Sequence, residues 1–340
     1  MVSQFFEIIW IGILDQKSRG QPGREVMSTM QRLGSDRLVD LNSTVEHQKL
    51  VDVHFRYSAN YWRNLYNASG LFEVIHQQRR AIVLGLVDEL ALPPGSHVLE
   101  IGCGAGLATI ALAQRGFTVQ AVDTVDRMVA LTRQAATEAS VADRVMTSLG
   151  DAHALAFPDG AFSLVIGMGV APFLHSLNTA ITECARVLRP GGYSIFTTDN
   201  RWRLNRVLDP VFFPPVRKPR RWVRTRLERF KVLKALAGPR ANSHSIREFD
   251  ACLAAAGLEK IKGTTVGFGP FTFFDIKLLP DSLSVRLHNK LQRLADSNHP
   301  LLQRFGSLYI PLVRKRSAEN SGVSSAFRQS GARGSALRVA

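Results

Sequence analysis

The stretch Val98-Leu99-Glu100-Ile101-Gly102-Cys103-Gly104-Ala105-Gly106 decides the fold of this 340-residue chain. Its first four residues are typical of the end of a buried strand, since three are apolar and only Glu100 is charged. Three glycines follow at alternate positions, and the run from Leu107 to Arg115 then predicts a helix. Glycine lets backbone N–H groups approach a ligand closely, so this order of elements favours a cradle for a nucleotide-like cofactor.

The spacing of the glycines separates two classes of cofactor site. A dinucleotide fingerprint has the pattern G-x-G-x-x-G, which would require glycine where this chain has Leu107. The pattern here is E-x-G-x-G-x-G. Because a glycine turn on its own is a weak signal, the residues on either side of it must indicate what the cradle binds.

Strands and helices alternate regularly from this stretch to about residue 200. We expect strands at 97–101, 118–122, 144–149, 162–167 and 193–198, with helices at 106–115, 125–139 and 177–188. Helical crossovers make the strands parallel, which predicts an α/β fold with a doubly wound sheet. Ligands of such sheets bind beyond the carboxyl ends of the strands.

Polar residues and a methionine stand where these strands end. Asp123 follows the second strand, and an acid there can accept both hydroxyls of a ribose. Asp151 follows the third strand, where its carboxylate can take an adenine amino group. Met168 ends the fourth strand, where a thioether can pack on the adenine ring. Capping of the next helix is an alternative role for either acid.

Taken together and in order, these motifs resemble the motif series of class I S-adenosylmethionine-dependent methyltransferases of the type that modifies small molecules and lipids. The resemblance covers about residues 97–200. It implies that Glu100 orders the glycine loop, Asp123 binds ribose, and Asp151 with Ala152 reads adenine, while Leu188–Gly192 is a structural turn before the fifth strand. The cofactor-binding residues implied in this way are Glu100, Gly102, Cys103, Gly104, Gly106, Asp123, Met128, Asp151, Ala152 and Met168.

The resemblance weakens after residue 200 but still implies a complete fold. We expect a helix at 245–256, a sixth strand at 258–266 and a last, antiparallel strand at 307–313, giving a Rossmann-like, seven-stranded, mostly parallel sheet with N-terminal helices and two inserted covers. The expected organisation is a mobile tail at 1–46, a methyltransferase domain at 47–314 and a disordered basic tail at 315–340. Within the domain we distinguish a helical cap at 47–92, a cofactor-binding core at 97–200, a basic insert at 201–241, and a C-terminal part with a Phe-rich helical insert at 242–314.

Charge and cysteine content limit the class of protein. The net charge is +15, yet residues 201–240 hold thirteen Arg or Lys against two acids, and residues 314–340 hold six against one. Three widely spaced cysteines argue for a reducing compartment and against a disulfide framework or a metal site. The apolar run Phe5–Leu14 is shorter than the roughly 20 residues of a membrane span. We therefore expect a cytoplasmic protein whose segment 201–241 suits peripheral contact with an anionic membrane.

The aromatic helix expected at 47–67 has two interpretations. It covers the edge of the sheet, or it forms a lid in which Tyr57 and Tyr61 meet the sulfonium or the substrate, since cations favour aromatic faces. His175, just past the fourth strand, is the best-placed candidate for a general base, with packing or capping as its alternative. We assign no other catalytic residue.

The function predicted from these features is transfer of a methyl group from S-adenosylmethionine to a small-molecule or lipid-linked acceptor, by in-line displacement at oxygen or carbon. A first alternative is an RNA methyltransferase whose basic insert grips phosphates. A second is a protein that binds S-adenosylmethionine without catalysis. The intact glycine loop disfavours the latter, and the chain has no recognisable RNA-binding module to support the former.

Overall fold

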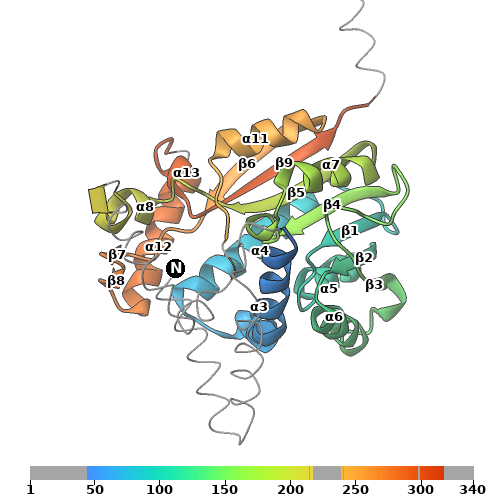
Figure 1. The fold of residues 1–340 in the computed structure, drawn as a ribbon, viewed down its shortest axis with the longest axis horizontal. Coiled ribbons are helices and arrows are strands. Elements are labelled where there is room, and N and C mark those ends of the chain that lie inside the picture. Colours follow the sequence, from blue (N-terminus) through green and yellow to red (C-terminus); the bar gives the residue numbers. More distant parts are fainter. Residues whose placement is uncertain (1–43, 214, 217–238, 240, 298, 318–340) are drawn as a thin grey trace, which may run out of the picture.

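A seven-stranded sheet forms the centre of the computed structural model, which describes residues 44–213, 215–216, 239, 241–297 and 299–317 (Figure 1). The strands run in the order β3-β2-β1-β4-β5-β9-β6, and β9 is antiparallel to both of its neighbours. The predicted mostly parallel, Rossmann-like sheet with an antiparallel last strand is confirmed. The strands are β1 (His97–Ile101), β2 (Thr118–Asp123), β3 (Val145–Leu149), β4 (Phe162–Met168), β5 (Leu188–Asp199), β6 (Leu258–Val266) and β9 (Leu308–Lys315).

Helices cover both faces of the sheet. Successive residues of a strand point to opposite faces, so Val98 packs in the cluster under α4 and α5, while Leu99 packs in the cluster under α7 and α11. Both faces are therefore apolar, as a parallel sheet requires. The helices are α4 (Leu71–Glu89), α5 (Leu107–Gln114), α6 (Asp126–Glu138), α7 (Leu177–Val187) and α11 (Ile246–Ala255), with the 3₁₀ helices η2 (Ala142–Arg144) and η3 (Ala171–Phe173).

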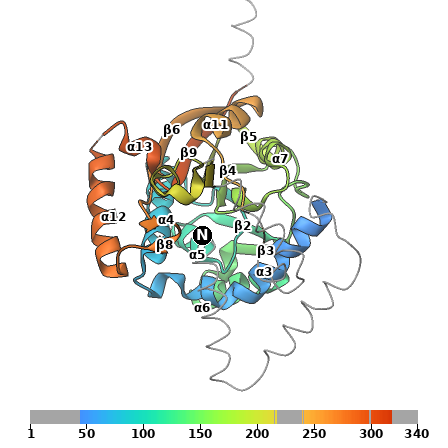
Figure 2. The same cartoon turned by 60° about the vertical axis from the view of Figure 1, so that its left-hand side comes forward.

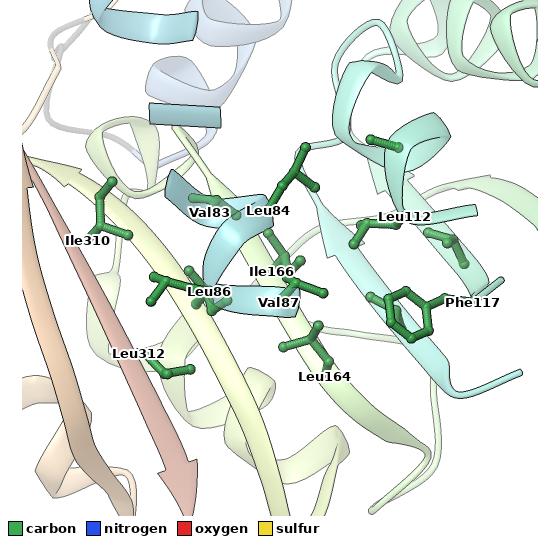
Figure 3. Close-up of a cluster of buried hydrophobic side chains, with 14 of the residues drawn as sticks. Val83, Leu84, Leu86, Val87, Leu112, Phe117, Leu164, Ile166, Ile310 and Leu312 are labelled. Atoms are coloured by element: carbon green, nitrogen blue, oxygen red, sulfur yellow. The ribbon is translucent and has the colours of Figure 1, made fainter. Parts of the chain in front are cut away.

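The face under α4 and α5 shows how the core fixes the site (Figure 3). Leu86 and Val87 of α4 lie against Leu164 and Ile166 of β4, and Leu112 of α5 completes the cluster. Fully burying side chains of this kind contributes about 1.5–3 kcal/mol each, relative to leaving them in water. This packing holds α5, and with it the loop that precedes α5, against the end of β1.

Additional helices lie around the carboxyl ends of the strands. Helix α3 packs on α6 and η1 packs on α4, while α12 packs on another side of α4, where Gln78 donates to Asn289 Oδ1 at 3.0 Å (Figure 2). These elements are α3 (Thr44–Asn64), η1 (Leu65–Asn67), α8 (Leu204–Leu208), η4 (Pro210–Phe212), the hairpin β7 (Thr272–Phe273) and β8 (Ile276–Lys277), α12 (Asp281–Asp296) and α13 (Leu302–Phe305). The predicted tails lie largely, and the basic insert mostly, outside the described residues.

One local prediction differs from the structure. The turn expected at Leu188–Gly192 lies inside β5, as an irregular segment where the register against β4 shifts between Phe162 and Leu164. Pro190 has no N–H to donate to a ladder, and Gly191 has a φ of 74°, so regular pairing resumes at Tyr193.

Candidate functional site

The carboxyl ends of β1, β2 and β4 open into one pocket, which α3 and η1 cover. It contains about 1140 Å³ of empty space, part of which is open to solvent. Of the ten residues predicted to bind a cofactor, nine line this pocket, although they come from four separate stretches of the sequence. The nine are Glu100, Gly102, Cys103, Gly104, Asp123, Met128, Asp151, Ala152 and Met168.

The glycine loop between β1 and α5 has a left-handed backbone at its three predicted glycines, with φ of 65°, 56° and 81° at Gly102, Gly104 and Gly106. A β-carbon at Gly104 would meet nothing within 4 Å, so this residue leaves room for a ligand. A β-carbon at Gly106 would lie 2.9 Å from the Cα of Thr132. Gly106 is thus outside the pocket lining, and its role in the structure is to let α6 approach the loop.

Asp123 connects the end of β2 to the glycine loop. Its Oδ2 accepts the backbone N–H of Gly104 at 2.9 Å, and its Oδ1 accepts that of Val125 at 3.0 Å. Burial raises the pKa of this carboxyl, and the two backbone donors partly oppose that effect. The bond to Val125 caps the next turn while the side chain also lines the pocket, so both roles considered for Asp123 fit its position.

Glu100 lies within β1 and is almost completely buried. It accepts a short hydrogen bond from Thr109 Oγ1 of α5, and burial raises its pKa to about 7. The bond joins β1 to α5 across the glycine loop. This geometry supports the role implied by the resemblance, which is to order the loop.

Asp151 lines the pocket beside two histidines. Its Oδ1 accepts from the backbone N–H of His153 at 2.9 Å and from Nδ1 of the same residue at 2.6 Å. Burial alone would raise the pKa of Asp151, but these bonds outweigh it and the pKa is lowered. The His175 ring stacks on His153 at a centroid distance of 3.5 Å and does not line the pocket. The structure therefore places the predicted candidate base outside the lining.

An aromatic group on α3 and η3 covers the pocket. Phe55 and Trp62 of α3 line it together with Phe173 of η3, and Phe55 meets Phe173 edge-on at 4.9 Å. The predicted Tyr57 and Tyr61 lie elsewhere. Tyr57 is 46% exposed, and the Tyr61 hydroxyl donates to Glu73 at 2.8 Å. The face of α3 that lines the pocket is therefore the neighbouring one, which carries Phe55 and Trp62.

The sequence pattern contained a signal for this face. Val51, Phe55 and Trp62 recur at spacings of four and seven, which places them on one side of a helix. Gln48, one turn before Asp52, donates to Asp52 Oδ1 at 2.8 Å, and Thr124 donates to the same oxygen at 2.8 Å. These bonds attach α3 to the segment after β2.

Arg79 of α4 is a pocket residue that the sequence interpretation did not identify. Its side chain is buried and reaches the end of β4, where a β-carbon on Gly169 would lie 2.8 Å from its Nη1. No sequence motif indicates this contact, because Arg79 and Gly169 are 90 positions apart. They meet only because α4 packs on the sheet and carries the guanidinium to the end of β4.

Two further findings concern metals and membranes. Among the residues that the structure describes, no three His, Cys, Asp or Glu side chains lie in a group able to hold a metal ion. No helix in that part of the chain is both long and apolar enough to cross a bilayer.

Comparisons with known proteins identify the core of the chain. Residues 99–196 match the family model described as "Methyltransferase domain". The ubiquinone biosynthesis O-methyltransferase of Pectobacterium carotovorum is 29% identical over 158 residues, covering 46% of this chain and 63% of the relative. The demethylmenaquinone methyltransferase of Lactiplantibacillus plantarum is 37% identical over 145 residues, covering 38% of this chain and 61% of the relative. The chain thus spans less than two thirds of the length of these relatives.

A solved structure shows the same fold. The geranyl diphosphate C-methyltransferase from Streptomyces coelicolor, in complex with Mg²⁺, geranyl diphosphate and S-adenosyl-L-homocysteine, aligns with a TM-score of 0.50 at 19% identity. The alignment covers 79% of this chain and 98% of that protein. At this identity the likeness concerns the arrangement of strands and helices.

Proposed function

We propose that this chain, whose core is a methyltransferase domain of the class I, S-adenosylmethionine-dependent type, transfers a methyl group to a small-molecule or lipid-linked acceptor. The observation that carries the proposal is the single pocket in which the glycine loop of β1, the acid of β2 and the aromatic lid of α3 meet. Relatives named for ubiquinone and demethylmenaquinone support an acceptor of this kind.

The residues that line the pocket suit S-adenosylmethionine in their chemistry. Gly104 leaves open space beside the loop, and the Asp123 carboxylate at the tip of β2 can accept from ribose hydroxyls. Asp151 with Ala152 would read the adenine, and the thioethers of Met128 and Met168 would pack on it. The remaining loop glycines and Cys103 would lie along the methionine portion.

When bound, S-adenosylmethionine supplies an electrophilic methyl group on sulfur, so the protein's contribution is mainly alignment and exclusion of water. Holding two reactants in line can supply up to about 7–11 kcal/mol of the barrier reduction. Phe55, Trp62 and Phe173 close the pocket over this site. The lid therefore supports transfer in a dry environment.

The hydrogen bonds around His153 bear on base catalysis. Its Nδ1 is bonded to Asp151, and its Nε2 accepts the backbone N–H of Ser176 at 3.3 Å. Both ring nitrogens are therefore engaged, and His153 is poorly placed to take a proton from an acceptor. His175 stays a candidate only if it turns away from the stack. Methylation at oxygen or at carbon both fit this arrangement.

An exposed apolar surface favours a lipid-linked acceptor. We call it the apolar edge, and it joins two segments because Asp209 accepts from Thr272 Oγ1 at 2.7 Å and from the backbone N–H of Phe274 at 2.8 Å. A group of solvent-exposed apolar side chains near the ends of the strands is a surface that can bind a membrane. The edge consists of Trp202, Val207, Leu208, Phe213, Phe273, Phe274, Ile276, Leu278 and Leu283.

This surface extends the membrane contact predicted for 201–241. Residues 214, 217–238 and 240 of that segment lie outside the described part, so the support comes from residues 202–213 and from the hairpin of β7 and β8. Leu208 and Ile276 are 63% and 70% exposed. Such side chains can enter the boundary between head groups and acyl chains while basic residues remain near the anionic head groups.

A direct test is methyl incorporation from labelled S-adenosylmethionine by the full chain. The acceptors to compare are demethylated quinones presented in vesicles, water-soluble catechols and bulk tRNA. Label in the quinone or catechol supports the proposal. Label in tRNA alone would establish the RNA-modifying alternative, and calorimetry without a heat of binding for S-adenosylhomocysteine would remove the proposal altogether.

A further inference from the structure

Three arginines gather around one aspartate at the end of β5. Arg203 donates from Nη1 to Asp199 Oδ2 at 3.4 Å. Arg79 of α4 and Arg206 of α8 also act electrostatically on the Asp199 carboxylate. Arg79 and Arg203 are each only 7% exposed, so two of the three guanidinium groups are at least nine-tenths buried.

The hydrogen bonding of Arg203 is incomplete in this arrangement. The single bond between Arg203 and Asp199 is long, and it is not the bidentate pair that a guanidinium and a carboxylate form when they match. Within the described residues, Nε of Arg203 and Oδ1 of Asn205 are buried and make no hydrogen bond. Burial lowers the pKa of Arg203 although Asp199 opposes the change. Buried cations of this kind normally have a matched anion.

The cluster reaches the pocket through Arg79. Arg79 lines the pocket and lies beside Gly169, whose backbone N–H donates to Thr197 Oγ1 at 2.7 Å. The glycine loop, Asp123 and Asp151 belong to the tips of β1, β2 and β3. The arginines therefore flank the tip of β5 and Gly169, the residue after Met168 of β4, so an acceptor held by them would lie next to the proposed cofactor.

We infer that Arg79, Arg203 and Arg206 form an oxyanion subsite that holds a carboxylate or phosphate group of the methyl acceptor. The inference rests on the proposed function, since it places the acceptor beside the methyl donor. Arginine suits this task because its planar fork of donors matches carboxylate and phosphate oxygens. The acceptor class is thereby narrowed to acidic compounds, whose anion docks at β5 while the accepting atom points toward the glycine loop.

The test uses calorimetry on the full chain saturated with S-adenosylhomocysteine, with pyrophosphate and benzoate as separate probes. At least one probe should bind, and Arg203→Gln should weaken that binding at least tenfold while leaving the affinity for S-adenosylhomocysteine within twofold. The matched control is Arg201→Gln, because Arg201 lies two positions away, is exposed and pairs with Glu248 at 2.7 Å. A preference for pyrophosphate or for benzoate identifies which oxyanion the site takes.

A second variant makes the result specific for charge. Asp199→Asn removes the carboxylate that is bonded to Arg203, so it should tighten probe binding, a change that mere loss of structure would not produce. If the wild type binds S-adenosylhomocysteine but neither probe, or if probe binding is the same in Arg203→Gln, the inference is wrong and the cofactor site stands. If S-adenosylhomocysteine itself does not bind, the proposed function fails instead. Should Arg203→Gln not fold, unchanged or weaker probe binding by Asp199→Asn overturns the subsite.

Discussion

Asp123 Oδ2 accepts the backbone N–H of Gly104 at 2.9 Å, so the acid at the tip of β2 holds the middle of the glycine loop at the tip of β1. Two motifs that lie 19 positions apart in the sequence act here as one unit. A side chain predicted to bind ribose thus also sets the shape of the loop beside it.

The first prediction follows from this double role. Asp123→Ala should lower the affinity for S-adenosylhomocysteine at least tenfold, equivalent to about 1.4 kcal/mol, because it removes the ribose acceptor and releases Gly104. Titration calorimetry measures the change, and circular dichroism checks that the fold is intact. Asp126→Ala is the control, since Asp126 is exposed three positions later and pairs with Arg56. Equal affinities for the wild type and Asp123→Ala would refute the ribose assignment.

Two glycines of the loop should respond differently to alanine. Gly104→Ala places a methyl group in open space, so it should impair cofactor binding while costing only the left-handed backbone strain of about 1–2 kcal/mol. Gly106→Ala brings a β-carbon to 2.9 Å from the Thr132 Cα and should lower the free energy of unfolding more. Denaturant titrations with and without S-adenosylhomocysteine separate the two effects. The reverse ranking would mean that the ligand does not lie beside Gly104.

Glu100 should make stability depend on pH. Burial raises its pKa from 4.5 to about 7, so the folded state binds this proton more tightly than the unfolded state. The free energy of unfolding that this group contributes is fully present below about pH 4.5. About 3 kcal/mol of it is lost as the pH rises to 7, since each unit of pKa difference between the folded and unfolded states corresponds to about 1.36 kcal/mol. Glu100→Gln should remove that loss.

The measurement is the difference in unfolding free energy between wild type and Glu100→Gln, taken by urea titration at several pH values. That difference should shift in favour of the variant by about 3 kcal/mol between pH 4.5 and 7. Glu259→Gln, at an exposed position of β6, controls for loss of a carboxylate as such. A constant difference between wild type and Glu100→Gln would show that Glu100 is not the group responsible.

The aromatic lid gives a fourth prediction. Trp62→Ala should reduce kcat/KM for methyl transfer at least tenfold, because Trp62 lines the pocket and its loss admits water. Tyr57→Ala should change kcat/KM less than twofold, since Tyr57 is exposed and outside the lining. Steady-state kinetics with a saturating methyl donor decide between the two faces of α3. A large loss in Tyr57→Ala alone would restore the tyrosine face as the lid.

The apolar edge gives a fifth prediction, on membrane contact. The double variant Leu208→Ser with Ile276→Ser should bind anionic vesicles at least fivefold more weakly than the wild type in a sedimentation assay. Ile261→Ser is the control, because Ile261 is 53% exposed on β6 and is not part of the apolar edge. If the control weakens binding as much as the double variant, the apolar edge is not the contact.

The sequence predicted the sheet well because its signals are local. Hydrophobic runs, glycine turns and strand-end acids each identify an element without knowledge of its neighbours, and the position of β9 came from the family resemblance. The pocket lining at β1, β2 and β4 followed for the same reason. What the sequence did not reveal depends on contacts between distant elements. Which face of α3 turns inward, and where the Arg79 guanidinium reaches, are decided by packing.

The histidines illustrate the limit. His175 follows β4 in the sequence and was a reasonable candidate base, yet its ring stacks on His153, which Asp151 holds in place. That arrangement needs the loop after β3 and the loop after β4 to meet side by side. Neither hydrophobic periodicity nor motif spacing predicts a contact between these two loops, so the role of His175 stays a prediction.

The position of β9 between β5 and β6 has a consequence for how the chain is made. On the ribosome, the strands from β1 to β5 emerge in an order that lets the cofactor half assemble during translation. β6 emerges before β9, its strand partner in the sheet that the structure describes, so its backbone groups cannot pair with β9 until that strand is made. The nascent protein therefore has an open sheet edge at β5 until β9 has emerged, and an edge of this kind is a template for pairing with another chain.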